Sequence, residues 1–400
     1  MPNNYRDLET PYFILDKLKL DNNITGLKSS LEKFWPNYMI GYSFKTNTLP
    51  WLLKYLLKNK FYAEVVSVNE YKLARAIGYP QNQIIYNGPV KNQKTFNDAL
   101  LNETIVNMDS QVEIEWLVQL LETTTRNFNV GLRVHFAIED ACPDEIGYEE
   151  DGTRFGFSVE TGELYRVIDR LLTTGRINIA GLHLHSTSKT RSIKVYRELA
   201  KMACRIKEHT HISFEYIDIG GGFFGGVPGK PAFDEYLTAI KQELQKAYNV
   251  SETKLILEPG SAIIGSPVSF VSSVIDAKDT LKSRIVTIDG SRMNIDPIMR
   301  KKMYSFDVWT EEGVKKIIPK QIVCGFTCMD LDRLMVLKDH AALAVGDRIV
   351  FNRVGSYTMS LNPLFINLFP VVYIKENNDI YVGREAMKIS DYLQIGSLVD

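Results

Sequence analysis

The 400-residue sequence contains few cysteines and no long apolar run. Its four cysteines, Cys142, Cys204, Cys324 and Cys328, are too few and too scattered to form a disulfide framework in a chain of this length, so reduced thiols are expected. No stretch of about 18 uninterrupted apolar residues occurs, and the N-terminus lacks a basic segment followed by an apolar one. These absences predict a cytoplasmic protein that does not bind membranes.

The sequence also lacks an excess of charge of either sign. Lys and Arg together number 47, and Asp and Glu together number 48. The net charge therefore gives no reason to expect binding to nucleic acid or to an anionic membrane. The apolar share of 45% and the charged share of 24% are ordinary for a globular chain. A small molecule is the expected substrate class.

Residues 38–260 alternate short β-rich runs with amphipathic stretches of helical period. Alternating strands and helices require crossovers and parallel strands, and eight such units are the number that closes a barrel. The sequence therefore predicts an α/β fold with a (β/α)8 barrel of the TIM type. The eight strand candidates are YMIGYSFKTN, YAEVVSVN, QIIYNGP, TIVNMDS, NVGLRVHFA, INIAGLHLH, ISFEYIDIGGG and LILEP.

After residue 260 the pattern changes to β-rich runs without intervening helices, which predicts a C-terminal all-β domain of barrel or sandwich type. Asn377, Asn378 and Asp379 separate two of these runs and indicate a hairpin. The opening run YFILD is expected to pair with this domain. The predicted boundaries are therefore 18–266 for the barrel, and 1–17 together with 267–400 for the all-β domain.

Three groups at the expected strand ends carry chemistry, because catalytic groups of such barrels collect at the carboxyl ends of the strands. Lys45 follows the apolar run MIGYSF, and a desolvated amine there can form a Schiff base, although a lone lysine is more often a surface residue. Gly220, Gly221 and Gly222 end the seventh candidate strand and let backbone N–H groups approach an anion such as phosphate. Glu258 ends the eighth and can pair with a protonated pyridine nitrogen.

Other readings of these motifs are less favoured. The glycine run also fits G-x-G-x-x-G, but ValProGlyLysPro follows where a helix should start, and Pro231 excludes a Walker loop. His183 and His185 form an H-x-H on the sixth candidate strand, and a metal site of the amidohydrolase type would need that pair on the first strand. No metal is therefore expected; one of the two histidines is expected against a flat ring and the other in the core.

Taken together, these motifs resemble the fold-type III pyridoxal-phosphate decarboxylases, the family of ornithine and diaminopimelate decarboxylases, with alanine racemase as a more distant relative. The resemblance covers nearly the whole chain in the same order. SerPheLysThrAsn around Lys45 is similar to the motif of the Schiff-base lysine. Further motifs are GluValValSerValAsnGlu, GLRVHF, HLHSTSK and LEPG. By this resemblance the cofactor-binding residues are Glu64, Ser67, Glu70, Arg133, His185, Ser188, Gly220, Gly221, Gly222, Glu258, Gly260 and Tyr357.

The resemblance implies a decarboxylase that removes the α-carboxylate of an amino acid with pyridoxal 5'-phosphate. CysGlyPheThrCys is similar to the motif whose last cysteine, here Cys328, reaches the active site of the neighbouring subunit of a homodimer. Cys328 is then the expected acid for the α-carbon and Lys45 the catalytic amine. A zinc site at this cysteine pair lacks a second pair nearby. An amino-acid racemase and a catalytically silent regulatory homologue are the alternatives.

Two departures from the family pattern concern the substrate. Ser261 follows LEPG where the family usually has Arg, and Met329 follows Cys328 where it usually has Asp or Glu, with the acid one place later as Asp330. Arg292 and Arg300 are candidates for binding a distal carboxylate, although solvated cations are common. The acidic stretch 139–151 can favour a cationic substrate, although such a stretch is more often a solvated loop.

Overall fold

The computed structural model describes residues 5–146, 152–186, 188–301, 303–310 and 315–396. The chain folds into two compact units. The barrel unit comprises residues 23–45 and 52–262, and the sheet unit comprises the residues up to 22, 46–51 and those from 263 onward. The grouping of 46–51 with the sheet unit is a feature that the sequence pattern did not predict.

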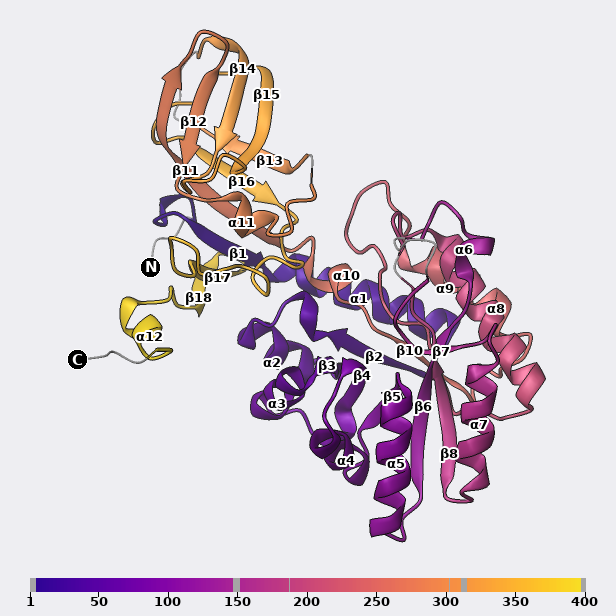
Figure 1. The fold of residues 1–400 in the computed structure, drawn as a ribbon. Coiled ribbons are helices and arrows are strands. Elements are labelled where there is room, and N and C mark those ends of the chain that lie inside the picture. The colour runs from indigo at the N-terminus through magenta and orange to yellow at the C-terminus, as the bar shows by residue number, and fades with distance from the viewer. Residues whose placement is uncertain (1–4, 147–151, 187, 302, 311–314, 397–400) are drawn as a thin grey trace. The chain divides into compact units, whose positions relative to one another are not determined.

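In the barrel unit, eight parallel strands of the described chain close into a ring, with helices between successive strands (Figure 1). The ring closes where β5 pairs with β6, and the short β7 (Phe157–Ser158) adds to β6 outside it. The predicted (β/α)8 barrel is therefore confirmed. In ring order the strands are β2 (Tyr38–Ser43), β3 (Tyr62–Ser67), β4 (Ile84–Val90), β5 (Ile105–Met108), β6 (Phe128–His135), β8 (Ile177–His183), β9 (Tyr216–Asp218) and β10 (Lys254–Leu257).

The helices of this unit follow the strands along the chain. Ser67 illustrates how a helix begins, because its Oγ accepts the N–H of Glu70 at 3.2 Å while Glu70 Oε2 accepts the N–H of Val66 at 2.8 Å, a reciprocal cap of α3. The helices are α1 (Lys17–Phe34), α2 (Pro50–Lys58), α3 (Val68–Ile77), α4 (Gln93–Leu101), α5 (Gln111–Thr123), α6 (Ile138–Ala141), α7 (Glu163–Thr173), α8 (Ile193–Thr210), α9 (Phe233–Leu244) and α10 (Ser261–Ile264), of which α1 and α2 begin and α10 ends in the sheet unit.

The interior of the barrel is packed around Tyr216. Met39, Ile85, Ala180 and Ile256, all from ring strands, pack with it as one buried cluster. A Cβ atom at Gly181 would collide with the Tyr216 ring, so this glycine makes room for a large aromatic inside a narrow ring of strands. The tyrosine therefore fills the barrel below the strand ends, as expected for a core without a pore.

The sheet unit consists mainly of β-strands, as the sequence predicted, with the strand order β15-β14-β12-β11-β1-β17-β18 and with β16 joining β11 to β13. β1, the YFILD segment, lies between β11 (antiparallel) and β17 (parallel). The sequence analysis did not find β13 and β15. The strands are β1 (Tyr12–Asp16), β11 (Val268–Asp279), β12 (Arg284–Ile288), β13 (Ser305–Trp309), β14 (Ile317–Cys324), β15 (Arg333–Ala341), β16 (Arg348–Asn352), β17 (Val371–Glu376) and β18 (Asp379–Arg384).

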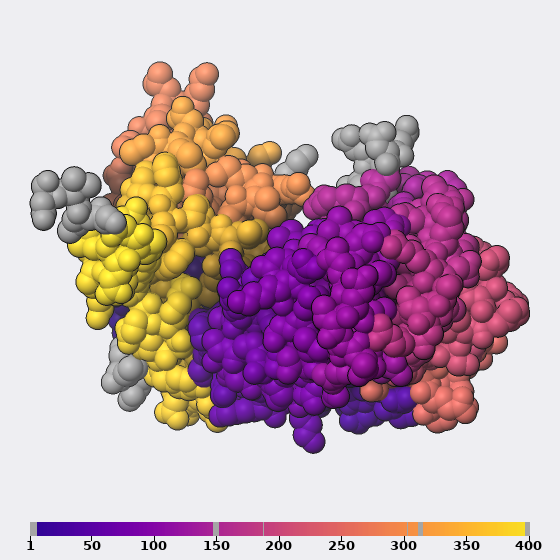
Figure 2. Space-filling view, turned by 60° about the horizontal axis from the view of Figure 1, so that its bottom comes forward, coloured from indigo at the N-terminus to yellow at the C-terminus, as the bar shows by residue number. Residues whose placement is uncertain are grey.

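Short helices interrupt this unit: η1 (Tyr5–Asp7), α11 (Arg292–Ile295) and α12 (Ile389–Leu393). In the space-filling view of Figure 2, α12 lies at the surface within the yellow C-terminal segment, and its Ile389 and Tyr392 are exposed. Among the described residues, none of the helices combines the length and the apolar character needed to cross a bilayer.

Candidate active site

Lys45 and Glu64 meet where β2 ends beside the neighbouring ring strand β3. Lys45 lies in the short 3-10 helix η2 (Phe44–Thr46), which follows β2. Its Nζ lies 3.1 Å from Oε2 of Glu64 on β3. The lysine side chain is 43% exposed whereas that of the glutamate is 1% exposed. Ser43 Oγ donates to the same carboxylate oxygen at 2.6 Å. A buried acid thus holds an amine that a ligand entering the barrel mouth can reach.

A chain of hydrogen bonds crosses the barrel and ends at two carboxylates. Tyr216 Oη donates to Asn107 Oδ1 at 2.7 Å, and Asn107 Nδ2 donates to Asn87 Oδ1 at 2.8 Å. Asn87 Nδ2 then donates to Glu258 Oε1 at 2.6 Å and to Glu64 Oε1 at 3.2 Å. Each amide oxygen in this series accepts a hydrogen bond and each amide nitrogen donates one, so the orientations of the two asparagine amides are fixed. Both N–H donors of Asn87 therefore point at carboxylates.

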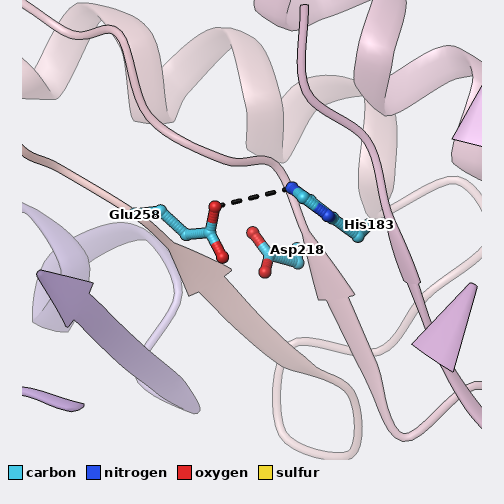
Figure 3. Close-up of side chains that lie close together, drawn as sticks. All are labelled: His183, Asp218 and Glu258. Carbon is cyan, nitrogen blue, oxygen red and sulfur yellow. Dashed lines mark ion pairs between the residues drawn. The ribbon is translucent and has the colours of Figure 1, made fainter. Parts of the chain in front are cut away.

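Glu258 is one of three buried titratable groups that lie together (Figure 3). His183 ends β8, Asp218 ends β9 and Glu258 follows β10. His183 Nε2 lies 3.5 Å from Glu258 Oε2, and one side-chain oxygen or nitrogen from each of the three residues lies within 4.8 Å of the others. Burial raises the pKa of Glu258, but the nearby charges of His183 and Lys45 oppose this effect and hold the pKa below its ordinary range. The carboxylate of Glu258 is therefore ionised.

His185 and the glycine run stand beside this cluster. Burial, followed by the nearby charges of Arg133, His183 and Lys45, lowers the pKa of His185 to about 3, so its ring is neutral at physiological pH. Gly220 has φ +69°, and a Cβ there would lie 2.5 Å from His185 Nδ1. A Cβ at Gly221 would collide with the carbonyl oxygen of Glu258. Only glycine permits this close approach of the backbone to the imidazole.

Arg133, on β6, is held from two sides. Its Nη1 lies 3.1 Å from Oδ2 of Asp109, and its guanidinium carbon lies 4.2 Å from the centroid of the Phe155 ring. The other oxygen of Asp109 accepts the N–H of Gly156 at 2.8 Å. The arginine and the aspartate are both buried. The guanidinium therefore has a fixed position at the end of its strand.

A matching family model decides the identity of the barrel. Residues 22–265 match the model described as "Pyridoxal-dependent decarboxylase, pyridoxal binding domain". The chain belongs to this family. It is a pyridoxal-phosphate-dependent amino-acid decarboxylase, which makes it a carboxy-lyase. Neither the racemase nor the silent homologue is favoured by the relatives found.

Relatives in sequence are diaminopimelate decarboxylases. That of Aquifex aeolicus is 26% identical over 365 residues, which cover 88% of this chain and 83% of the relative. That of Methanocaldococcus jannaschii is 24% identical over 404 residues, which cover 96% and 90%. Both diaminopimelate decarboxylases thus align with the barrel unit and with the sheet unit of this chain.

Solved structures of decarboxylases have the same fold. The M. jannaschii diaminopimelate decarboxylase in complex with L-lysine has a TM-score of 0.87 at 20% identity, covering 98% of this chain and 92% of that one. The arginine decarboxylase of Paramecium bursaria Chlorella virus bound to agmatine has a TM-score of 0.74 at 18% identity, covering 90% and 95%. The arrangement of a barrel and a mostly β second domain is therefore shared across the decarboxylases.

The residues at the strand ends fit the cofactor of the family. The site offers an accessible amine at Lys45, an ionised buried carboxylate at Glu258, a neutral flat ring at His185 and a backbone of three glycines that carries no side chains. Within the described residues, Nδ1 of His185 and Oγ of Ser186 are buried without a hydrogen-bond partner. Buried polar atoms normally have partners, so these atoms favour a polar ligand at this place.

Three of the residues expected at the cofactor have local partners. Ser67 and Glu70 cap α3, and burial raises the pKa of Glu70. Ser188 Oγ donates to Glu145 Oε2 at 3.1 Å and accepts the N–H of Arg191 at 2.8 Å. Glu145 belongs to the acidic stretch, of which residues 147–151 lie outside the described part of the chain. Gly260 is buried directly before α10.

The remaining candidates lie in the sheet unit. Cys328, Met329 and Asp330 lie in a turn after β14, which ends at Cys324. The buried Asp332 shapes this turn, because its Oδ2 accepts the Oγ1–H of Thr327 at 2.7 Å.

Arg292, Arg300 and Tyr357 have different surroundings. Arg292 Nη2 lies 3.1 Å from Asp296 Oδ2, so its charge is already paired, whereas Arg300 is exposed. Tyr357 has φ +55° and donates its N–H to the carbonyl of Thr46, the residue after Lys45, at 2.9 Å. Thr46 and Tyr357 both belong to the sheet unit, so this contact is internal to it.

Sequence reasoning missed Asn87, Asp109 and Asp218. Each is a polar residue that ends or interrupts an apolar run: YNG on β4, NMD after β5 and IDIGGG on β9. A buried strand that contains one polar residue is a usable signal, because such a residue must have a partner inside the barrel.

Proposed function

We propose that Lys45 binds the aldehyde of pyridoxal phosphate, that Glu258 faces its ring nitrogen and that the run Gly220, Gly221 and Gly222 holds its phosphate. The observation that carries this proposal is the double donation of Asn87. One amide contacts both the acid that holds Lys45 and Glu258, so the reactive amine and the ring-pairing carboxylate lie on two sides of one side chain. When bound, the cofactor accepts the electrons that the substrate releases as carbon dioxide leaves.

The protein's residues prepare this chemistry. Glu64 and Ser43 position the Lys45 amine, and Glu258 supplies a fixed negative charge where a positive ring nitrogen is stabilised. His185 presents an uncharged face for stacking on the ring. Arg133, fixed by Asp109, lies close enough to lower the pKa of His185 and is assigned to cofactor binding with Glu70, Ser67, Ser188, Gly260 and Tyr357.

Cys328 is proposed as the acid that protonates the α-carbon of the product. This assignment is supported by the similarity of CysGlyPheThrCys to the family motif, and it includes a homodimer in which Cys328 serves the neighbouring subunit. The thiol is exposed in the isolated chain, so it is free to enter such an interface. The cytoplasmic location expected from the sequence belongs to the same proposal.

The substrate is proposed to be an amino acid whose distal group is not bound by the usual family residues. Ser261 and Met329 cannot form the ion pairs of the Arg and the acid that they replace. Asp330, one place beyond Met329, is an acid available for a distal amine, and Arg300 is an exposed cation available for a distal carboxylate.

Carbon dioxide release tests this proposal. The purified protein, loaded with pyridoxal phosphate, is incubated with L- and D-forms of diaminopimelate, lysine, ornithine, arginine and their side-chain-acylated forms, with the Lys45→Ala variant as the blank. Release from an amino acid in wild type alone supports the proposal. Loss of chirality without carbon dioxide would replace it by racemisation.

A further inference from the structure

Asp218 is a buried acid to which the proposed mechanism gives no task. It is 0% exposed, and its Oδ1 accepts the N–H of Gly220 at 2.8 Å. Its Oδ2 is buried without a hydrogen-bond partner in the described part of the chain. In Figure 3 its carboxyl group lies beside Glu258 and His183, and the three groups approach within 4.8 Å. An isolated buried carboxylate in this position requires an explanation.

Two neighbouring buried carboxyl groups cannot both be ionised at low cost, so one of them keeps a proton. The partners of the two acids differ. Glu258 accepts the 2.6 Å hydrogen bond from Asn87 and faces His183, whereas Asp218 accepts one backbone N–H. The titratable groups that face Asp218 are Glu258, His183, Glu64 and Tyr216, and in the described part of the chain its side chain has no ion pair with a lysine or an arginine.

We propose that Asp218 is a positioning residue that stays protonated and donates a hydrogen bond from Oδ2 to Glu258, fixing the charge and direction of the carboxylate that faces the cofactor ring. Burial, together with the charge of Glu258, raises the pKa of Asp218 well above its ordinary value, in agreement with this geometry. The inference rests on the proposed task of Glu258. It deepens that proposal by naming the group that maintains the charge.

The backbone makes this arrangement rigid. The N–H of Glu258 donates to the carbonyl oxygen of Gly220 at 2.7 Å, and the N–H of Leu184 donates to that of Asp218 at 2.7 Å. His183 pairs with Asp218 in register across β8 and β9. The acid, its acceptor and the imidazole are therefore fixed by three adjacent strand ends, and a change at one side chain leaves the frame intact.

A divalent cation is the competing occupant of this cluster, because its three side chains are of ligand types. Structural zinc sites take four protein ligands, and in the residues described only three are offered here. Oε1 of Glu258 is already bound by Asn87. A shared proton satisfies the same three side chains without a fourth ligand.

The proposal is tested with Asp218→Asn and Asp218→Ala. Asparagine keeps an oxygen for Gly220 and places an N–H donor where the protonated Oδ2 stood, so it should rescue the interaction. Alanine removes the donor. We expect the dissociation constant for pyridoxal phosphate to stay within about threefold of wild type in Asp218→Asn, and to rise about ten- to a hundredfold in Asp218→Ala.

Infrared spectroscopy of the full-length protein at pH 8 supplies a readout independent of activity and of folding in the alanine variant. Wild type should show the carbonyl band of a protonated carboxylic acid, Asp218→Asn should lack it, and Asp234→Asn, at an exposed acid on α9, should retain it. Absence of the band in wild type, equal weakening of cofactor binding in both variants, or a stoichiometric metal ion would overturn the proposal. Failure of the cofactor to attach to Lys45 would instead overturn the proposed function and leave the infrared result standing.

Discussion

Lys45 Nζ lies 3.1 Å from Oε2 of Glu64, where Lys45 follows the end of β2 and Glu64 lies within the adjacent strand β3. The register of these strands pairs Ser43 with Glu64, which places the lysine one turn beyond the acid. The pair is thus a product of strand register and not of local sequence. It gives a reactive amine a defined position before any ligand enters, which is the basis of catalysis by orientation.

The pair between Arg133 and Asp109 predicts weaker cofactor binding when it is broken. Asp109→Asn removes a charge-assisted hydrogen bond and leaves a buried guanidinium unpaired, so we expect cofactor affinity to fall about ten- to a hundredfold. Fluorescence titration of the apoprotein measures this. The matched control is Glu115→Gln, which breaks the exposed pair with Arg170 and should leave affinity unchanged. Equal affinity in wild type and Asp109→Asn would remove Arg133 from the site.

Lys91 and Glu113 form a buried ion pair that predicts a large effect on stability. Lys91 Nζ contacts Glu113 Oε1 at 3.1 Å and the carbonyl of Gly88 at 2.6 Å, and its side chain is 0% exposed. Lys91→Met leaves an uncompensated buried carboxylate, so we expect a loss of about 3–5 kcal/mol and a melting temperature lower by about 6–20 °C. Calorimetry of the double variant with Glu113→Leu should recover most of this loss. A double variant as unstable as the single one would contradict this account.

His185 predicts a stability change with pH. In the folded protein the pKa of His185 is about 3, whereas its ordinary value is about 6.5. Between pH 3 and pH 6.5 the histidine is therefore protonated in the unfolded chain and neutral in the folded one. Stability is therefore present above pH 6.5 and is lost on acidification, by about 2 kcal/mol from pH 7 to pH 5. Urea unfolding of the apoprotein should show this slope, and His185→Gln should reduce it by that amount. Parallel profiles for the two proteins would mean that the histidine is not buried.

Cys328 predicts a specific catalytic defect. Cys328→Ala should lower kcat by about 10²- to 10⁴-fold, the usual contribution of a general acid, with little change in cofactor binding. Steady-state carbon dioxide release measures kcat. Cys324→Ala is the matched control, because burial raises the pKa of the Cys324 thiol and so makes it a weaker proton donor. Normal turnover by Cys328→Ala would assign the proton to another group.

The sequence predicted the barrel because its strands and helices alternate regularly. Lys45 and Glu258 could be predicted as site residues because each is a charged residue directly after an apolar strand. The sequence did not predict β13 or β15. Ser305–Trp309 is short and contains no buried residue, and Arg333–Ala341 carries exposed charged residues on both faces, so neither segment gives a strong strand signal. Pairing with β16 and β14 makes them strands.

The network behind the site was not predictable from local patterns. Asn87, Asn107 and Tyr216 come from β4, β5 and β9, and only closure of the barrel brings them together. Ser67 and Glu70 show the opposite case, because their spacing of three is also that of a helix cap, and the structure contains that cap. A motif that resembles a cofactor-binding motif, as the segment of Ser67 and Glu70 does, can thus also have a structural role.

Attachment of the cofactor to Lys45 is the most direct test. The protein is loaded with pyridoxal phosphate, reduced with borohydride, digested and analysed by mass spectrometry, with Lys45→Ala and Lys91→Met treated in parallel. We predict one modified peptide carrying the reduced cofactor at Lys45 in wild type and in Lys91→Met, and none in Lys45→Ala. Modification at another lysine, or an unmodified Lys45 in protein that has bound the cofactor, would contradict the account.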